Sequence, residues 1–267
     1  MDNLQRVAFS AADQWLEQAG FLSLNAGLNY IDVIIDQAGS ERPVAEALNQ
    51  LSPAVRQASL FEGTPEEGMQ DDGPVLVRLF WPEWQHKALL AEFMQYWGGA
   101  SRLMLLISPL VFDELKSRLG ALTQFEWGDQ TGVLRFYDSR VFPALLSHVL
   151  SEEQQVAFTD IAFYWGWQDR DMCQIWKQGS IGSDSRTLPD PTILTFNDQQ
   201  IENIGCISDA EMLARNIEKE NISREKNFQR CFSASLAASH EGYFGELSDY
   251  IQQFDGSNGG GYEKEGA

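Results

Sequence analysis

The sequence predicts an α/β fold in which a mixed sheet with flanking helices is followed by a smaller C-terminal helical lobe. Up to about residue 180, segments rich in β-branched and aromatic residues alternate with segments whose apolar residues recur every three or four positions. Beyond residue 192 the β-prone segments stop, while the helical spacing continues. This change of pattern separates the two predicted parts of the chain.

The clearest unit of the α/β part lies at residues 132–149. Residues 133–137 are β-branched and aromatic, as expected of a buried strand, and Asp138 or Ser139 offers a side-chain oxygen to cap a following helix. The apolar residues of that helix share one face: Phe142, Leu145, Leu146, Val149 and Leu150. A strand that leads directly into a helix forms half of a βα unit.

The same reasoning predicts further strands at residues 30–35, 59–61, 75–80, 102–107, 123–127, 161–167 and 174–176. Helical spacing predicts helices at residues 4–19, 44–51, 85–97, 109–122, 151–158, 208–217, 228–236 and 247–254. Capping boxes predict helix starts at residues 64–67, 151–154 and 208–211. The segment 128–132 has the composition of a hairpin turn.

Composition divides the chain into four predicted parts. Residues 1–27 form an N-terminal helical extension that need not belong to the main core, and residues 28–180 form the α/β domain. A polar segment at 182–190 is a candidate linker to the helical lobe, which spans residues 192–255. The glycine-rich residues 256–267 are expected to form a flexible tail.

The net charge argues against two classes of partner. The 267 residues include 39 acids against 19 lysines and arginines, which gives a formal charge of -20. Such a charge repels the phosphates of nucleic acids and anionic lipid headgroups, so we expect neither a nucleic acid nor a membrane as partner. It is typical of a soluble surface, and the open alternative is a protein partner with a basic face.

The cysteines and the N-terminus indicate the compartment. Three cysteines without CxxC spacing argue against a disulfide framework and for a reducing environment. Residues 1–18 contain an early acid and no continuous apolar run, so they do not resemble a signal peptide. The most apolar stretch, residues 103–112, is too short to span a bilayer. We therefore expect a cytoplasmic protein.

No catalytic or cofactor-binding motif is recognisable. The three histidines, His86, His148 and His240, are far apart in the sequence. We find no metal-ligand spacing, no nucleophile elbow and no phosphate-binding loop.

Two carboxylates nevertheless stand at candidate positions. Asp36 and Asp138 each close a predicted strand, where α/β proteins place ligand and catalytic groups. Two interpretations stay open: the carboxylates meet in a site, or each caps a turn or helix. Arg135 and Arg140 flank Asp138 and are available to pair with it.

Aromatic residues are the best candidates for contacts with a partner. Tryptophans concentrate near the end of the α/β part, where they form either a protein-binding surface or core filling between the lobes. The helical lobe is predicted to contribute most to the choice of partner, because the α/β core constrains its pattern least. The candidate contact residues are Trp165, Trp167, Trp176, Phe228, Phe232, Tyr243 and Phe244.

Four segments between residues 28 and 167 carry a resemblance: LNYIDVIIDQAG, SLFEGTPEEGMQDDGPVLVRL, GASRLMLLISPLVFDELKSRL and VLRFYDSRVFPALL. In this order and spacing they resemble the motifs of the bacterial type VI secretion effector-chaperone (adaptor) family. The most specific motif contains Phe136, Tyr137, Asp138, Arg140 and Val141. The next is a turn that contains Leu60, Phe61, Gly63 and Thr64. The region after residue 192 is similar to the family's variable C-terminal part in pattern only.

The resemblance implies a non-enzymatic adaptor that binds a cognate toxin effector and promotes its loading onto the valine-glycine-repeat spike protein. It implies no cofactor, no metal and no catalytic residue, and a scaffold role for the motif residues, Asp36 included. Two other hypotheses stay open. One is a small carboxylate-dependent hydrolase that uses Asp36 and Asp138. The other is an acidic inhibitor of a basic target protein.

Overall fold

A computed structural model of the protein describes residues 11–40, 44–182, 188–216 and 222–258. The chain divides into two compact units. The α/β unit comprises Met1–Pro143 and Leu150–Thr195, and the helical unit comprises Ala144–Val149 and Phe196–Ala267. Each unit is described by itself below.

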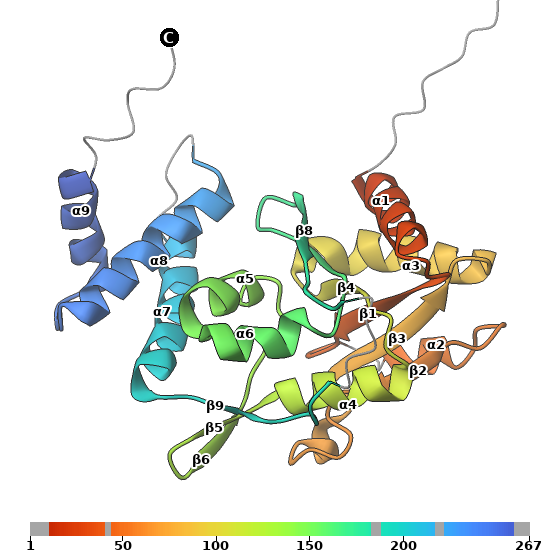
Figure 1. Ribbon diagram of the computed structural model, residues 1–267. Coiled ribbons are helices and arrows are strands. Elements are labelled where there is room, and N and C mark those ends of the chain that lie inside the picture. The colour runs from red at the N-terminus through yellow and green to blue at the C-terminus, as the bar shows by residue number, and fades with distance from the viewer. Residues whose placement is uncertain (1–10, 41–43, 183–187, 217–221, 259–267) are drawn as a thin grey trace, which may run out of the picture. The chain divides into compact units, whose positions relative to one another are not determined.

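The α/β unit is built on a six-stranded sheet in the order β2-β3-β1-β4-β7-β8 (Figure 1). Its strands are β1 (Tyr30–Asp36), β2 (Arg56–Ser59), β3 (Pro74–Phe80), β4 (Leu103–Ile107), β7 (Tyr164–Gln168) and β8 (Gln174–Gln178). All neighbouring strands are antiparallel. The α/β class with flanking helices is thus confirmed, and parallel pairing occurs in a second, smaller sheet.

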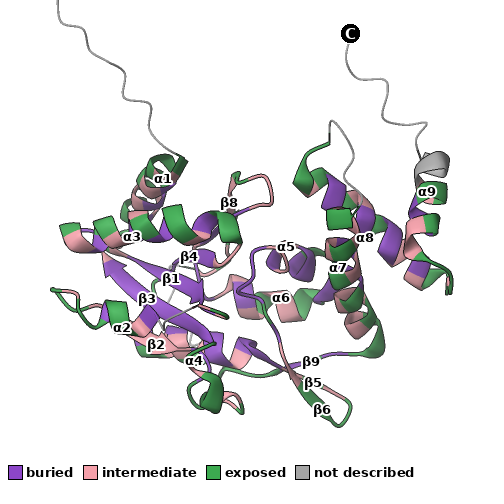
Figure 2. Ribbon diagram, turned by 180° about the vertical axis from the view of Figure 1, so that it is seen from behind, coloured by how far each residue is buried: buried purple, intermediate pink, exposed green. Residues whose placement is uncertain are grey.

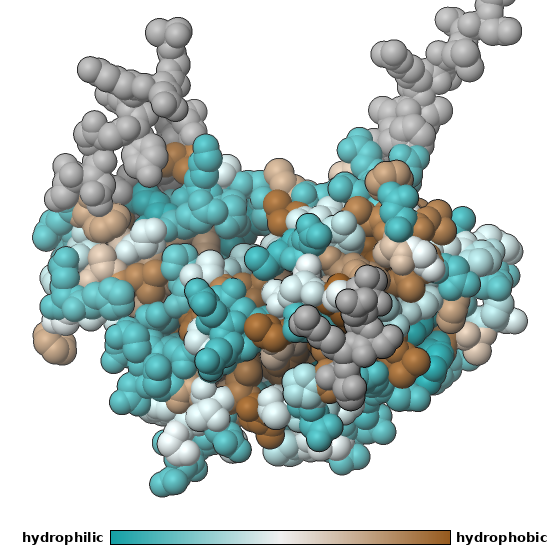
Figure 3. Space-filling model, in the orientation of Figure 1, coloured by the Kyte–Doolittle hydropathy of each residue, from teal (hydrophilic) through white to brown (hydrophobic). Residues whose placement is uncertain are grey.

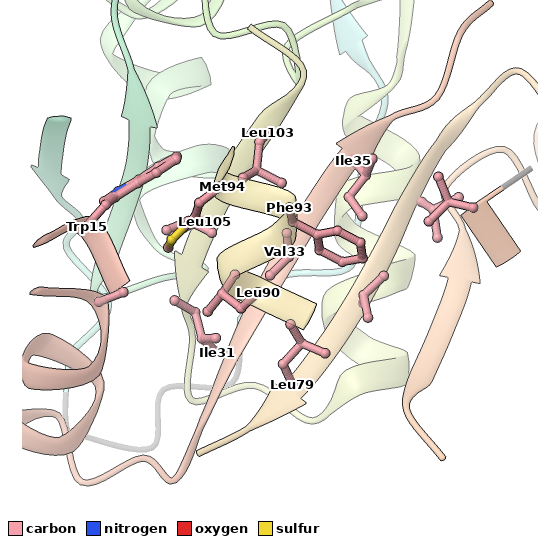
Figure 4. Close-up of a cluster of buried hydrophobic side chains, with 14 of the residues drawn as sticks. Trp15, Ile31, Val33, Ile35, Leu79, Leu90, Phe93, Met94, Leu103 and Leu105 are labelled. Carbon is pink, nitrogen blue, oxygen red and sulfur yellow. The ribbon is translucent and has the colours of Figure 1, made fainter. Parts of the chain in front are cut away.

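One face of the sheet carries the main apolar core (Figure 4). Successive side chains of a strand point to opposite faces, so Ile31, Val33 and Ile35 of β1 lie together on this face. Helices α1 (Ala11–Asn25) and α3 (Trp84–Trp97) contribute Trp15, Leu90 and other side chains to the same cluster. The predicted N-terminal extension therefore belongs to the main core, because Trp15 is fully buried there.

The helix α1 differs from its predicted bounds of 4–19 at both ends. Residues 4–10 lie outside the described residues, and Gly20 does not end the helix. A Cβ at Gly20 would only just touch the Trp81 ring, at 3.9 Å, so the helix passes this position at ordinary packing distance. The helix ends before Gly27, whose φ of 75° is left-handed and suits a glycine.

The opposite face of the sheet is covered by α4 (Phe112–Leu122) and α6 (Glu152–Thr159). The cross-strand partners Arg78, Asp32, Leu106 and Trp165 share this face. Here Phe112 lies near Arg78, and Phe158 packs on Trp165 at a ring distance of 6.3 Å. The sheet is therefore covered on both faces, which explains why the central strands β1, β3 and β4 appear as near-continuous apolar runs in the sequence, whereas the edge strands β2 and β8 do not.

The prediction of a strand at 133–137 is wrong. The hairpin consists of β5 (Gln124–Trp127) and β6 (Gln130–Val133), joined by a turn at Gly128 with φ of 56°. Thr123 still accepts a hydrogen bond from the Leu134 N–H, but residues 134–141 then leave the hairpin as an irregular segment. We call residues 134–141 the crossover segment. Phe136 and Tyr137 are buried, as they would be in a strand. The apolar content of the segment therefore did not distinguish a strand from an irregular segment.

The predicted capping boxes have three different outcomes. Ser151 accepts from the Gln154 N–H and Gln154 bonds back to the Ser151 N–H, so the box at 151–154 is confirmed. Thr64 caps only a tight turn, followed by the 3₁₀ turn η1 (Glu67–Met69). Residues 208–211 lie inside a helix that has already begun, because α7 spans Asp198–Asn216. In a helix interior the backbone N–H groups already bond to carbonyl groups of the same helix, so a capping sequence there does not mark a helix start.

The remaining elements of the α/β unit are short. They are α2 (Val44–Leu48), η2 (Gly98–Ala100), the start of α5 (Phe142–Ala144), and β9 (Leu194–Thr195). Strand β9 pairs in parallel with β5 in the three-stranded sheet β6-β5-β9. The predicted second strand at 59–61 begins earlier, at Arg56, because Leu60 and Phe61 already form the turn after it.

The helical unit consists of η3 (Leu145–Val149), α7, α8 (Arg224–His240) and α9 (Leu247–Asn258). Helices α7 and α8 pack through buried small and aromatic residues, among them Cys206, Ala210 and Phe232. Asn203 of α7 donates to the His148 carbonyl, which holds η3 on α7. Helix α9 includes residues 256–258, which we assigned to the tail; residues 259–267 lie outside the described residues.

We expect the substitution Gly179→Ala to destabilise the α/β unit by about 1–3 kcal/mol. A Cβ at Gly179 would collide with the Ala162 carbonyl oxygen and lie 2.6 Å from that of Thr159, and neither backbone atom moves easily. The matched control is Gly205→Ala in α7, where no atom lies within 4 Å and alanine favours the helix by about 1 kcal/mol. Urea unfolding of both variants checks the opposite signs.

Candidate functional site

The crossover segment brings the most specific motif of the sequence to the end of strand β1. Asp36, the last residue of β1, accepts a hydrogen bond from the Ala38 N–H at 3.1 Å. Its second oxygen receives the Arg135 Nη2 at 2.7 Å, which ties the crossover segment to the central strand. Asp36 is almost fully buried, whereas Arg135 is half exposed.

Asp138 is engaged separately from Asp36. Its Oδ1 accepts from the backbone N–H and the Nε of Arg140, both at 3.0 Å, and its Oδ2 from Arg140 Nη2 at 2.6 Å. The structure thus gives each carboxylate a turn N–H and an arginine, which is the structural interpretation left open above. The predicted pairing of Asp138 with Arg135 is not observed, because Arg135 reaches Asp36 instead.

Tyr137 lies between these two ion pairs. Burial raises the pKa of its hydroxyl far above the ordinary value of a tyrosine, and the negative charge of Asp36 raises it further. Arg135 opposes this effect, while Asp138 and Glu66 add to it. These effects favour the protonated form of the hydroxyl.

The crossover segment also joins the ends of other strands. Ser139 donates through Oγ to the Gln168 carbonyl at the end of β7, and its N–H reaches the Ser101 carbonyl just before β4. Arg170 donates to the Arg140 carbonyl at 2.9 Å. Phe136 anchors the segment from within, because it is fully buried among aromatic rings. The motif therefore works as a clamp across the ends of three neighbouring strands.

The second motif, the turn after β2, is also part of the scaffold. Leu60 and Phe61 are buried, and Gly63 has a left-handed φ of 79°. The Thr64 hydroxyl donates to the Phe61 carbonyl at 2.9 Å and accepts from the Glu66 N–H. These contacts fix the shape of the turn and leave its acidic residues on the surface.

Most of the aromatic residues that we predicted as partner contacts are buried or partly buried, and Figure 2 shows buried residues along helix α8. Trp165 and Trp167 are buried because Phe142 packs against both rings, at 4.8 and 5.4 Å. Phe228 and Phe232 are buried because they stack on each other inside the helical unit. Trp176 is partly buried against the main core. These five side chains fill the interior and offer little surface to a partner.

Tyr243 and Phe244 lie in the loop between α8 and α9. The Tyr243 N–H bonds to the Ala238 carbonyl and the Gly242 N–H to the Ser239 carbonyl, which together form a Schellman motif with Gly242 at φ of 63°. The Tyr243 ring then packs on Tyr250 at 5.0 Å. Phe244 follows with a fully exposed side chain. A rigid turn thus presents one aromatic side chain to solvent.

The sequence analysis missed a buried ion pair between the central strands. Arg78 of β3 donates Nε and Nη2 to the two oxygens of Asp32 on β1, at 2.7 and 2.8 Å. Arg78 also donates to the Leu110 carbonyl and lies 3.9 Å from the Tyr30 ring centre. Burial raises the pKa of Asp32 to about 6, against the lowering effect of Arg78. In the sequence, this ion pair is indicated by one charged residue, Asp32 or Arg78, within each of two β-prone segments.

An open groove runs along the edge strand β2, with a volume of about 950 Å³. Its long wall is helix α4, from Phe112 to Ala121, and Asn49 lies on its other side. The turn after β2 and the segment that contains Pro191 and Ile193 also line it. None of the residues predicted from the aromatic pattern lies in this groove.

The described part of the chain holds no group of three or more His, Cys, Asp or Glu side chains that could bind a metal ion. His86 is buried, and its Nδ1 accepts from the Phe80 N–H. Cys206 and Cys231 are buried and Cys173 is exposed, and none of the three forms a disulfide. Among residues that the structure describes, no helix has the length and apolarity to cross a bilayer. Figure 3 shows hydrophilic residues with hydrophobic residues interspersed among them.

Comparison with known proteins gives one match. Residues 33–157 match a family described as "Domain of unknown function (DUF4123)". Neither the curated proteins nor the solved structures contain a match to this chain. The matched range includes the crossover segment, the turn after β2 and most of the six-stranded sheet.

Proposed function

We propose that this protein is a non-enzymatic adaptor of a bacterial type VI secretion system, which binds a cognate toxin effector and promotes its loading onto the valine-glycine-repeat spike protein. The matched domain family is known in type VI secretion effector-chaperone contexts. The four sequence segments that resemble that family overlap the matched range.

One observation carries the proposal: the charged residues at the end of β1 and in the crossover segment are occupied in holding the scaffold together. Asp36 bonds to Arg135, and Asp138 bonds to Arg140. A general base or nucleophile needs a free, accessible functional group near its substrate. These carboxylates instead stabilise the crossover segment, as expected of a motif that preserves a binding scaffold.

The helical unit supplies a candidate contact for the effector. Aromatic side chains are enriched among the residues that dominate binding energy at protein interfaces. Phe244 is fully exposed, and the turn before it is fixed by backbone hydrogen bonds, so little conformational entropy is lost when it inserts into a pocket. Glu241, Glu246 and Asp249 surround it in the sequence, which favours a pocket with a basic rim.

The proposed function is tested by co-expression with the toxin encoded beside this gene. We expect the two proteins to co-purify in a defined stoichiometry, and the complex to bind the spike protein more tightly than the effector alone does. In cells, deletion of the gene is expected to abolish secretion of that effector while other effectors are still secreted. Secretion that continues unchanged without this gene would contradict the proposal.

We expect Phe244→Ala to weaken binding of the effector by about 10- to 30-fold, as for an interface hot spot. The side chain makes no contribution to the core, so the thermal unfolding midpoint should stay unchanged. Isothermal titration calorimetry with the purified effector measures the effect. Phe21→Ala is the matched control, because Phe21 is an exposed phenylalanine of the α/β unit. Equal affinities of the two variants would remove Phe244 from the interface.

A further inference from the structure

The edge strand β2 leaves backbone groups available for another strand. It pairs only with β3 among the described strands, and the Leu60 N–H bonds to the Pro74 carbonyl at 2.9 Å. In an antiparallel pair the residues alternate between hydrogen-bonded and non-bonded positions. Counting back from Leu60, Ala58 is bonded to β3, so Gln57 directs its N–H and C=O away from the sheet. No described residue donates to or accepts from these two groups.

The groove beside β2 has the shape that an added strand needs. Asn49, at the end of α2, lies on one side of it and helix α4 on the other. The α4 side of the groove combines small residues, Ser117, Gly120 and Ala121, with the longer side chains of Asp113 and Lys116, and Gly120 packs close to the Leu60 carbonyl. At about 950 Å³ the groove exceeds the space of one side chain and is open to solvent. A short extended segment can therefore reach the backbone of β2 without displacing the scaffold.

The charges at the groove indicate which composition an added peptide segment should have. Its two cations are already paired, Arg56 with Asp113 at 2.8 Å and Lys116 with Glu62 at 3.3 Å. The turn beyond one end, residues 62–72, contains five acids and no base. Ile193, at 46% exposure, supplies apolar surface within the groove, whereas the Phe112 ring is buried beneath Arg56. The matching ligand is an extended peptide with an apolar residue and, at one end, lysine or arginine.

We propose that an extended, partly basic segment of the effector adds to β2 as a seventh strand of the main sheet. This inference rests on the proposed function, since the partner is the effector, but it assigns a second contact distinct from the Phe244 loop. Backbone hydrogen bonds to Gln57 would supply affinity, and the acidic turn would set the direction of the segment. Together with the Phe244 loop, this contact would give the effector one contact on each unit.

The test compares Gln57→Pro with Gln57→Ala. Both variants lose the side-chain bonds of Gln57 to Ala45 and Asn49, but only proline removes the outward N–H. Proline is tolerated at an outward position of an edge strand, so the β2–β3 pairing is kept. We expect Gln57→Pro to bind the effector at least 10-fold more weakly than Gln57→Ala, with similar thermal midpoints. In wild type, hydrogen exchange at residues 55–59 should slow when the effector binds.

Further measurements separate the other outcomes. Overlapping synthetic peptides of the effector should include one basic peptide that competes for wild type and not for Gln57→Pro. The double variant Asp71→Lys, Asp72→Lys should weaken that peptide without altering β2. Equal binding by the two Gln57 variants, with no protection at 55–59, overturns this inference and leaves the proposed function standing. Absence of any complex with wild type overturns both.

Two further measurements test other occupants of the β2 edge. If wild type forms a dimer in analytical ultracentrifugation and Gln57→Pro does not, the edge binds a second copy of this chain, and the inference is overturned. If removal of residues 259–267 exposes β2 in hydrogen exchange without effector, the chain's own C-terminus occupies the edge. That result would overturn the inference too.

Discussion

Replacing Asp32 with leucine is expected to lower the free energy of unfolding by about 3–5 kcal/mol. Asp32 is fully buried on β1, where it accepts both hydrogen bonds of the Arg78 fork. Without it, Arg78 keeps the Leu110 carbonyl and the Tyr30 ring but loses its counter-charge inside the sheet. An unpaired buried charge is among the most destabilising defects in a protein. Urea unfolding followed by circular dichroism measures the loss.

The control is the double variant Asp32→Leu, Arg78→Met, which removes both charges. Burial raises the pKa of Asp32, which shows that desolvation of this carboxylate outweighs the attraction of its arginine. We therefore expect the double variant to recover most of the stability lost in the single one, or to exceed wild type. If the double variant is as unstable as the single variant, the pair itself stabilises the fold and our interpretation fails.

Replacing Phe136 with alanine is expected to cost about 3–5 kcal/mol, comparable to the loss of a core ring in other proteins. Phe136 is fully buried, and its ring lies 5.5 Å from that of Phe158 and 6.2 Å from that of Trp165. It is the apolar anchor of the crossover segment. The cavity left by its ring would therefore also weaken the hydrogen bonds by which the neighbouring polar residues hold this segment to the strand ends. Denaturant unfolding gives the magnitude, and hydrogen exchange at residues 134–141 reports the loosening.

The matched control is Phe136→Leu, which keeps most of the apolar contact and should cost less than about 1.5 kcal/mol. Under the loop conformation of the structure, both variants leave the β5–β6 pairing intact, because that hairpin ends at Val133. Loss of hydrogen-exchange protection at β5 in Phe136→Ala would mean that the segment continues the hairpin as a strand, contrary to the structure.

The strands that the sequence predicted well are those buried on both faces. Tyr30 to Ile35 and residues 75–80 and 102–107 are predominantly apolar, apart from Asp32, Arg78 and Arg102, and a near-continuous apolar run is what a doubly covered sheet requires. The antiparallel order could not be predicted, since it depends on which edges pair. The strand predicted at 133–137 fails for a related reason: burial of Phe136 and Tyr137 arises from a crossing over strand ends, without a sheet edge beside it.

The candidate site likewise combines features that the sequence predicted with features that only the fold shows. The sequence pointed to Asp36 and Asp138 as paired carboxylates or as caps, and only the fold shows that different arginines neutralise them. The tryptophan cluster gave no indication whether it was surface or core, because tryptophan is frequent in both. The groove along β2 had no sequence signature, because its walls come from residues 49–65, 112–124 and 191–193.

By itself, the sequence determined the α/β class, the positions of the buried strands, and the helical character after residue 192 apart from the short strand β9, because these follow from local apolar periodicity. It also determined the strongly acidic surface, since net charge is a sum over residues. Only the tertiary structure decided which polar groups bond to one another within the scaffold and which strand edge is left without a neighbouring strand among the described residues. Those properties depend on contacts between residues far apart in the sequence, such as Asp36 and Arg135 at 99 positions, which local pattern does not encode.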